Sequence, residues 1–290
     1  MSNLQRFYTR FLELFHQLTS EDNFLNQIRT PLLSDKELIA LSLAAEAASI
    51  DSELNLFTQL PKQVIGKIER SVYNRRRRQL KPTIEKFRQQ IAHHIIPCET
   101  YHLVDSMPLE VCKYSRANRS QICSQTLESA PDFGYCASQK MKFYGYKIHA
   151  VCTEQGVFKH LSLSKASMHD VNYLQEVSEH FSQCVLIGDK GYLSEAHQYD
   201  LFEKRRIELM TPRKSNQVYK PFPWIFRKAR KRIETLFSQL CDQFMIRRNY
   251  AKTYDGFSTR ILAKVTALTM IQWSNKLSGN KLNNLKIAIS

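Results

Sequence analysis

The sequence has little glycine and proline and no long apolar run, and these absences exclude several classes of protein. Eight glycines and nine prolines in 290 residues, beside 43% hydrophobic residues, indicate a globular chain. No apolar run approaches the roughly 20 residues that cross a bilayer, and the N-terminal stretch has no signal-peptide layout. We therefore expect a cytoplasmic protein without a membrane partner, long enough for one large and one smaller domain.

Paired cysteine motifs are also missing. No C-x-x-C pair occurs, so the sequence indicates neither a zinc knuckle nor a disulfide framework. We expect reduced thiols that pack as small hydrophobic groups. The seven cysteines are Cys98, Cys112, Cys123, Cys136, Cys152, Cys184 and Cys241.

Acidic residues are scarce, above all toward the C-terminus. The chain has 42 Lys and Arg against 27 Asp and Glu, a net charge of +15. Residues 99–226 are nearly balanced, with 15 basic and 14 acidic residues, whereas residues 227–290 hold 13 basic and 3 acidic ones. A chain this basic favours a polyanion as its partner, and nucleic acid is the first candidate.

Residues 1–98 show helical spacing and predict an all-helical domain. Ser34, Asp35, Lys36 and Glu37 form a capping box that opens a helix through Ala48. The short turn after it is compatible with a helix-turn-helix, so we expect a DNA-binding domain. A small bundle that only packs is an equal alternative.

A basic helical stretch follows from about residue 64 to 96 and is interrupted near Pro82. It contains the run 75–78 of four arginines. Two interpretations of this run are about equally favoured: a helix face in contact with solvent, or a group of side chains that binds DNA phosphates. The second interpretation makes Arg76 and Arg77 candidate DNA contacts.

From Tyr101 the pattern changes to short β-rich segments and helices, with a domain boundary near Pro97. The order predicts an α/β domain over residues 99–245, built as a mixed sheet flanked by helices. A C-terminal helical extension over 246–290 follows it. The expected strands are 101–105, 142–151, 156–164, 184–188 and 207–211, and the expected helices are 170–181, 194–206 and 224–244.

Two aspartates are expected at the ends of strands. Asp105 follows the apolar "YHLV", and Asp189 follows "VLIG" with a glycine on each side. Strand ends line the ligand crevice of open α/β sheets, so the two can be neighbours. Each is also compatible with an ordinary turn, and for Asp105 alone the turn is the preferred interpretation. Asp189 is the stronger candidate, because flanking glycines permit close approach.

A third carboxylate, Glu234, lies in the basic segment "RKARKRIETLFSQL". On a helix it shares a stripe with Arg230, one turn earlier, beside a separate apolar face. A solvent-exposed ion pair between Arg230 and Glu234 would explain the spacing of these two residues, but it would not explain why so many basic residues surround them.

Three carboxylates in one crevice repel each other unless cations lie between them. Oxygen ligands favour Mg²⁺, with Mn²⁺ as an alternative. Two such ions about 3.5–4 Å apart activate a nucleophile and stabilise the leaving 3′-oxygen in a phosphoryl displacement. Asp105, Asp189 and Glu234 are therefore the candidate catalytic residues and metal ligands, with two ions per site.

The pieces "HLVDSMP", "FYGYKIHAV", "LIGDKGY" and "RKRIETLFSQL" occur in an order that resembles the DDE transposases of bacterial insertion sequences. The resemblance covers roughly residues 100–245. It implies a ribonuclease H-like core, and Asp105, Asp189 and Glu234 as metal ligands. Family members carry Tyr-x-x-Arg-x-x-x-Glu-x-x-x-x-x-x-Lys. Here Arg227 and Cys241 replace the Tyr and the Lys.

The resemblance implies Mg²⁺-dependent hydrolysis at the inverted repeats of a mobile element, followed by attack of the freed 3′-hydroxyl on target DNA. It implies double-stranded DNA as partner, a homodimer on that DNA, and a nucleoid location in a bacterium. The candidate DNA contacts are Arg230, Arg227, Lys231, Lys190, Arg76 and Arg77.

Two rival functions remain open. A host nuclease or resolvase of the same fold would share the hydrolysis but not the joining of DNA strands. A non-catalytic DNA-binding regulator would need none of the carboxylates.

Three lesser candidates have ordinary structural interpretations. Lys147 and His149 alternate on one strand face and can both point toward the crevice. A hydrogen-bonded structural role is favoured for His149, and Lys147 can lie at the sheet rim. Asp170 precedes a helix, where the role of helix cap is favoured.

Overall fold

The computed structural model describes residues 2–212 and 223–285, which form two compact units. One unit contains residues 1–95 together with 239–290, and the other contains residues 96–238. The division into 1–98, 99–245 and 246–290 stays a prediction, because it concerns the role of each part. By contacts alone, the C-terminal helices belong with the N-terminal ones.

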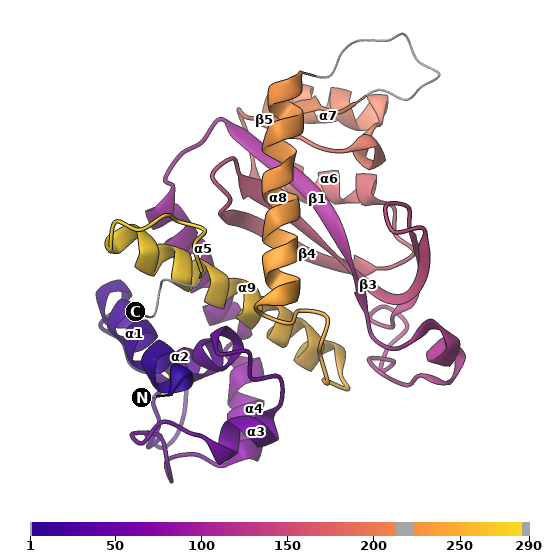
Figure 1. Cartoon of the computed structure of the whole chain (residues 1–290). Helices are drawn as coiled ribbons and strands as arrows, with labels where there is room; N and C mark the ends of the chain where they lie inside the picture. The colour runs from indigo at the N-terminus through magenta and orange to yellow at the C-terminus, as the bar shows by residue number, and fades with distance from the viewer. Residues whose placement is uncertain (1, 213–222, 286–290) are drawn as a thin grey trace. The chain divides into compact units, whose positions relative to one another are not determined.

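Figure 1 shows the described elements of both units. Those of the first unit are α1 (Asn3–Leu18), α2 (Asp35–Ala47), α3 (Glu53–Thr58), α4 (Arg70–Gln79), α5 (Lys81–Ile95) and α9 (Tyr254–Leu277). Those of the second are β1 (Tyr101–Glu110), η1 (Tyr114–Arg119), β2 (Asp132–Cys136), β3 (Met141–Thr153), β4 (Phe158–Lys165), η2 (Asp170–Asn172), α6 (Tyr173–His180), β5 (Val185–Ile187), η3 (Lys190–Tyr192), α7 (Glu195–Arg205) and β6 (Glu208–Met210). Helix α8 (Trp224–Asp242) begins in the second unit and ends in the first.

The helical unit begins as the sequence predicts. Ser34 accepts a hydrogen bond from the backbone of Glu37, and the Glu37 side chain accepts one from the backbone of Ser34, which completes the capping box. The basic stretch forms two helices, α4 and α5, and the break falls at Leu80, just before Pro82. Proline is tolerated there because the first turn of a helix leaves its N–H groups without partners.

A buried charge cluster joins three helices of this unit. Glu46 of α2 is 2% exposed and accepts hydrogen bonds from Arg260 and Lys264 of α9. Arg77 of α4 lies 3.9 Å from the same carboxylate. Burial alone would raise the pKa of Glu46, but the three cations together lower it. This cluster is one of the ties between α9, distant in sequence, and the N-terminal helices, beside the burial of α9 along most of its length.

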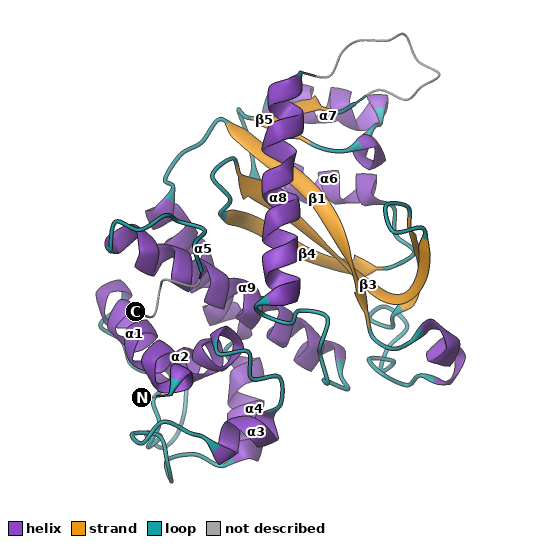
Figure 2. Cartoon of the chain, viewed as in Figure 1, coloured by secondary structure: helices purple, strands orange, loops and turns teal. Residues whose placement is uncertain are grey.

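The second unit contains a six-stranded mixed sheet (Figure 2). The order is β2-β3-β1-β5-β6, and β4 also pairs with β3. β3 pairs antiparallel with β1, β2 and β4, whereas β5 pairs parallel with β1 and with β6. The expected hairpin of β3 and β4 is present. β2 was not expected from the sequence, because it is short, contains Gly134 and gains its partner only when β3 is in place.

Strand β1 is longer than the sequence predicts, and this corrects the expected position of Asp105. The strand continues through Asp105 to Glu110 and includes Pro108. Val111 donates to Tyr144 of β3, so the alternation of the antiparallel ladder turns the nitrogen of Pro108 away from β3. Because β5 pairs only with residues 101–103, that edge of β1 is open and a missing N–H costs nothing there.

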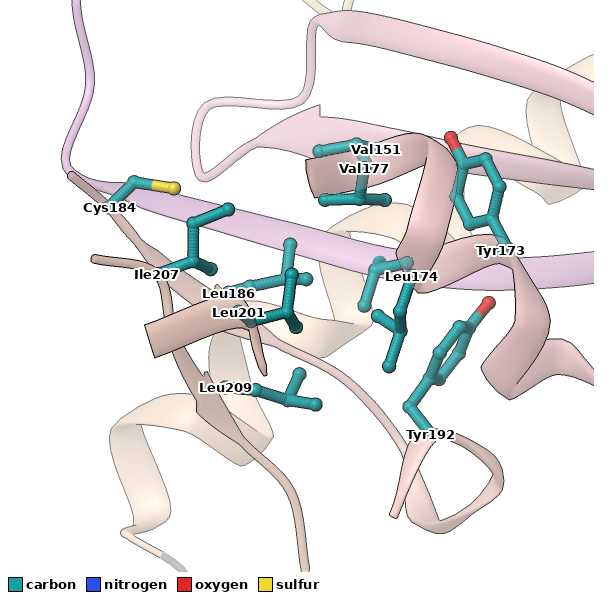
Figure 3. Packing of buried hydrophobic residues seen from close by; sticks show 11 residues of the cluster. Val151, Tyr173, Leu174, Val177, Cys184, Leu186, Tyr192, Leu201, Ile207 and Leu209 are labelled. Carbon is teal, nitrogen blue, oxygen red and sulfur yellow. The ribbon is translucent and has the colours of Figure 1, made fainter. Parts of the chain in front are cut away.

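Helices α6 and α7 cover one face of the sheet. Their core contains Tyr173, Leu174 and Val177 of α6 and Leu201 of α7 (Figure 3). These residues pack against Val104, Val151, Leu186 and Leu209 of the strands. Such a layer of apolar side chains removes one face of the sheet from water.

Helix α8 crosses the other face of the sheet (Figure 1). Its buried side chains Ile233, Leu236 and Phe237 have the spacing of one helix face. Phe237 lies against Phe158 of β4, with ring centroids 6.2 Å apart. The unit is thus a ribonuclease H-like α/β fold, with helices on both sides of a mixed sheet, as the sequence resemblance implied.

All seven cysteines are free thiols. None of the helices in the described residues combines the length and the apolar character that a bilayer span requires.

Replacing Glu46 by Gln should destabilise the helical unit strongly. The variant leaves Arg260 and Lys264 buried without their anion, while Arg77 keeps its ion pair with Glu53, and this costs about 3–5 kcal/mol. Because the pKa of Glu46 is lowered in the folded protein, its contribution is lost as the pH falls through that value, which lies below 4.5. Urea unfolding of both proteins at neutral and acidic pH measures this, and a difference that does not shrink in acid would contradict it.

Candidate functional site

The register of two strands brings the two aspartates together. In the parallel pair of β1 and β5, Tyr101 lies opposite Val185 and Leu103 lies opposite Ile187. The same register, continued by two residues, places Asp105 beside Asp189. Asp189 follows the end of β5, so the two carboxylates meet where the pairing of these strands stops.

The pleat of β1 decides which way Asp105 points. Val104 packs in the core beneath α6 and α7, and side chains alternate along a strand. Asp105 therefore lies on the opposite face, which is the face crossed by α8. Its carboxylate accepts a hydrogen bond from the backbone N–H of Ser106 at 2.8 Å.

Asp189 is held by the turn that follows β5. Its Oδ1 accepts a hydrogen bond from the backbone N–H of Gly191 at 2.7 Å and caps the short helix η3. Gly188 leaves little room for a side chain, because an added Cβ would lie 3.0 Å from Val104 and 3.2 Å from Tyr192 and would have to displace them. Gly188 therefore lets β1 and the turn come close enough for the two aspartates to face one cavity.

Helix α8 supplies the third carboxylate. Its apolar stripe is buried, which leaves Glu234 exposed and Arg230 partly buried beside that stripe. The Nε atom of Arg230 is buried and has no hydrogen-bond partner among the described residues. The two residues are one helical turn apart, so both reach the same region.

These side chains share a cavity of about 470 Å³. Asp105, Asp189, Glu234 and Arg230 line it, together with Asp170 and Lys147. The turn after β2 forms another part of its wall, over residues 135–138. The cavity wall thus carries four carboxylates, from four segments of the chain, and two basic side chains, Lys147 and Arg230.

The electrostatics of Asp105 reflect this crowding. Burial raises its pKa to about 7 from an ordinary 3.8, and repulsion by Asp189 and Glu234 adds to the rise. The N–H of Ser106 and the guanidinium of Arg230 act in the opposite direction. A cation bound among the carboxylates would relieve both the desolvation and the repulsion.

The residues fit a hard divalent ion in their donor chemistry. The acidic side chains of the cavity offer carboxylate oxygens as ligands, and Mg²⁺ and Mn²⁺ prefer oxygen ligands. Among residues 2–212 and 223–285, however, no group of three or more His, Cys, Asp and Glu side chains is arranged closely enough to hold a metal ion. The three carboxylates line one cavity but do not form a complete metal-binding site.

The remaining predicted DNA contacts divide into two groups. Arg227 and Lys231 on α8 and Lys190 beside Asp189 are exposed. Arg76 and Arg77 of α4 are buried, with 6% and 4% exposure.

The burial of Arg76 and Arg77 corrects the phosphate-clamp interpretation of the arginine run. Arg76 forms an ion pair with Asp35, and Arg77 pairs with Glu53 at 3.2 Å. Arg76 also donates to the carbonyl of Leu33 at 2.9 Å. Acidic residues of the same unit therefore hold the two guanidinium groups away from solvent.

Sequence reasoning gave too little weight to Asp170 and Lys147. Asp170 begins η2, but its side chain forms an ion pair with Lys147 at 3.0 Å and lines the cavity. The position of Asp170 at the start of a helix does not indicate this ion pair, because its partner Lys147 lies 23 residues earlier in the chain. His149 is buried and bonded to Ser164 at 2.7 Å, in agreement with a structural role.

Comparison with known proteins gives one family and one structure. The family model described as "Transposase DDE domain" matches residues 97–270. No curated protein matches the chain. Among solved structures, the chain is similar to the Mos1 transposase paired-end complex with left transposon end, at 12% identity over 94% of this chain and 86% of that one. The TM-score is 0.24, too low to bear on fold or function.

Replacing Asp105 by Asn should stabilise the metal-free protein at a pH above 7 and have no effect below 3.8. A carboxyl whose pKa is raised in the folded state favours folding when protonated, and stability is lost as the pH rises through the folded pKa. We expect a gain of about 1–3 kcal/mol, since one pKa unit corresponds to about 1.4 kcal/mol and cavity water screens part of it. Urea unfolding in chelator-treated buffer measures the gain, and a variant less stable than the wild type at high pH would contradict it.

Proposed function

The chain belongs to the transposase DDE domain family, and from this premise we propose that it is the transposase of a bacterial insertion sequence. Family membership assigns it to DNA transposition and to the nuclease and strand-transfer enzymes. The proposal adds that it binds the inverted repeats of its element, hydrolyses the DNA at the ends and joins the freed 3′-hydroxyl to target DNA. The single observation that carries the proposal is the cavity shared by Asp105, Asp189 and Glu234.

In this proposal the three carboxylates are the ligands of two divalent ions, Mg²⁺ or Mn²⁺. The bound ions supply activation of the attacking water or hydroxyl and stabilisation of the leaving 3′-oxygen. Asp105 and Asp189 are held by the strand register and by backbone N–H groups, whereas Glu234 reaches in from α8. Burial first, and repulsion by Asp189 and Glu234 second, raise the pKa of Asp105, and a bound cation would relieve both, which supports a site built for cations.

The cations around the cavity have a second task. Arg230 would hold a phosphate oxygen of the bound strand, since its side chain lines the cavity beside the carboxylates. Arg227, Lys231 and Lys190 are exposed near the same carboxylates and would contact the DNA backbone. These contacts position the DNA strand but do not read its sequence.

The proposal places the protein in the bacterial cytoplasm at the nucleoid, acting on double-stranded DNA as a homodimer. Joint cutting of two element ends requires two active sites held on one DNA complex. The helical unit is then the candidate for recognition of the repeats, without the contribution of Arg76 and Arg77 that the sequence suggested.

Replacing Asp189 by Asn or Glu234 by Gln should abolish DNA cleavage and leave DNA binding intact. Each variant removes a direct ion ligand, which should cost more than the roughly 10–100-fold that is typical of residues behind ligands. The substrate is a plasmid carrying the gene with its own flanking DNA, incubated with Mg²⁺. Asp200→Asn is the matched control, because Asp200 also pairs with a lysine, Lys204, but on the exposed face of α7. A non-catalytic regulator would retain every activity in all three variants.

Strand joining separates a transposase from a host nuclease of the same fold. A short duplex that ends in the inverted repeat, already cut to expose its 3′-hydroxyl, should become joined to a supercoiled target plasmid. The same duplex with a 3′-deoxy end should not be joined, because the nucleophile is missing. Linear plasmid without attached duplex would indicate hydrolysis alone and would favour the nuclease.

A further inference from the structure

Asp170 is the acidic side chain of the cavity that the DDE pattern does not include. It comes from η2, which leads into α6, whereas the other three come from β1, the turn after β5, and α8. Its side chain is 25% exposed, and that of its partner Lys147 is 14% exposed. Both residues therefore belong to the wall of the cavity and not to an outer surface.

Lys147 engages only one of the two carboxylate oxygens of Asp170. Its Nζ lies 3.0 Å from Oδ1 of Asp170 and donates a second hydrogen bond to the carbonyl of Met168 at 2.7 Å. These two contacts fix the ammonium group between η2 and the segment before it. The orientation of the Asp170 carboxylate is set as a consequence.

The other oxygen of Asp170 borders the space next to Asp189. A Cβ added to Gly191 would lie 3.4 Å from Oδ2 of Asp170 and 2.9 Å from Oδ1 of Asp189. The two aspartates thus approach one small volume above Gly191 from two sides. The backbone of Gly191 is not in the left-handed region, so a side chain there would matter through space: its Cβ would press on the Asp189 carboxylate, which accepts a hydrogen bond from the Gly191 N–H.

A capping role does not account for Asp170. His169 is the residue that precedes η2, and Asn172 precedes α6. Neither makes a side-chain capping bond. The negative charge of Asp170 in the first turn of the three-residue helix η2 contributes little to that helix. A lysine placed to hold that carboxylate at the rim of an already acidic cavity requires another explanation.

We propose that Asp170 is a fourth acidic residue of the ion site, a positioning residue whose Oδ2 orders the hydration of the cation beside Asp189 while Lys147 fixes its orientation. This inference depends on the proposed function, since it assumes that Asp105, Asp189 and Glu234 take a divalent ion. Outer carboxylates of this kind raise ion affinity by holding ligands and water in one arrangement. Gly191 keeps the path between the two aspartates open.

Direct binding of Mn²⁺ to the full chain tests the proposal without any reaction. In titrations with MnCl₂ followed by electron paramagnetic resonance, Asp170→Asn should weaken binding by about 10–100-fold. Asp170→Glu keeps the charge and should recover part of the affinity. Asp200→Asn, the variant of an exposed lysine-paired aspartate, should bind as the wild type does. Thermal unfolding of each variant checks that the fold is retained.

The role of Lys147 is tested by a double-mutant cycle. Lys147→Met should reduce Mn²⁺ affinity in the wild type but change it little in the Asp170→Asn background, because Lys147 acts through Asp170. An equal effect in both backgrounds would overturn the positioning role of Lys147. If Asp170→Asn fails to fold, the two single variants that keep a carboxylate are compared with the wild type directly: wild-type Mn²⁺ affinity in both Asp170→Glu and Lys147→Met would overturn the inference, and weaker binding by Lys147→Met would support it.

Failure of this inference can be distinguished from failure of the proposed function. If Asp189→Asn loses Mn²⁺ binding and cleavage while Asp170→Asn and Lys147→Met retain wild-type affinity, Asp170 is an ordinary ion-pair partner and the inference is wrong. If Asp189→Asn also binds Mn²⁺ and cleaves DNA normally, the ion site itself is wrong. A cleavage defect of Asp170→Asn that excess MnCl₂ restores would support the inference.

Discussion

The parallel register of β1 against β5 is the constraint on which the site depends. It places Asp105 and Asp189 at equivalent positions just beyond the last paired residues, Leu103 and Ile187. A shift of one residue would turn Asp105 toward the apolar layer under α6 and α7 and carry Val104 to the cavity. The core formed by Val104, Leu186 and their neighbours therefore fixes the register, and the register fixes the carboxylates. Packing on one face of the sheet determines chemistry on the other.

Glu46 is fully buried and Asp105 is half-buried at a cavity, and the contrast between the two acids separates structure from function. Glu46 is enclosed by three cations, which lower its pKa and make it part of the scaffold of the helical unit. Asp105 is enclosed with more acids than bases, and its pKa rises to about 7. Desolvation opposes the charge in both places. The protein supplies enough positive charge to balance Glu46 but not to balance Asp105 and the carboxylates around it. A cation from solution therefore gains more by binding at Asp105.

The sequence predicts the parts of this arrangement that depend on local pattern. Asp189 follows a buried strand between two glycines, and Glu234 shares a stripe with Arg230 beside an apolar face, so both could be placed from neighbouring residues alone. Other features depend on distant partners. Pro108 is accepted in β1 only because β5 stops short of it, and Arg76 is buried because Asp35 is there to receive it. The role of Asp170 requires Lys147 and Gly191, which no local pattern links to it.

Helix α8 has two parts to play. Its apolar face packs on the sheet, and its other faces present charged side chains to the cavity and to solvent. Ile233, Leu236 and Phe237 anchor it to the sheet and fix its rotation about its own axis. That rotation brings Arg230 and Glu234 to the flank of the helix, at the rim of the cavity, and turns Lys231 farther outward. Of the charged side chains of α8, Glu234 and Arg230 line the cavity, whereas Arg227 and Lys231 are exposed and do not line it. A cation entering the cavity meets carboxylates, whereas a DNA strand lying along the helix meets arginine and lysine, so the two ligands do not compete for the same groups.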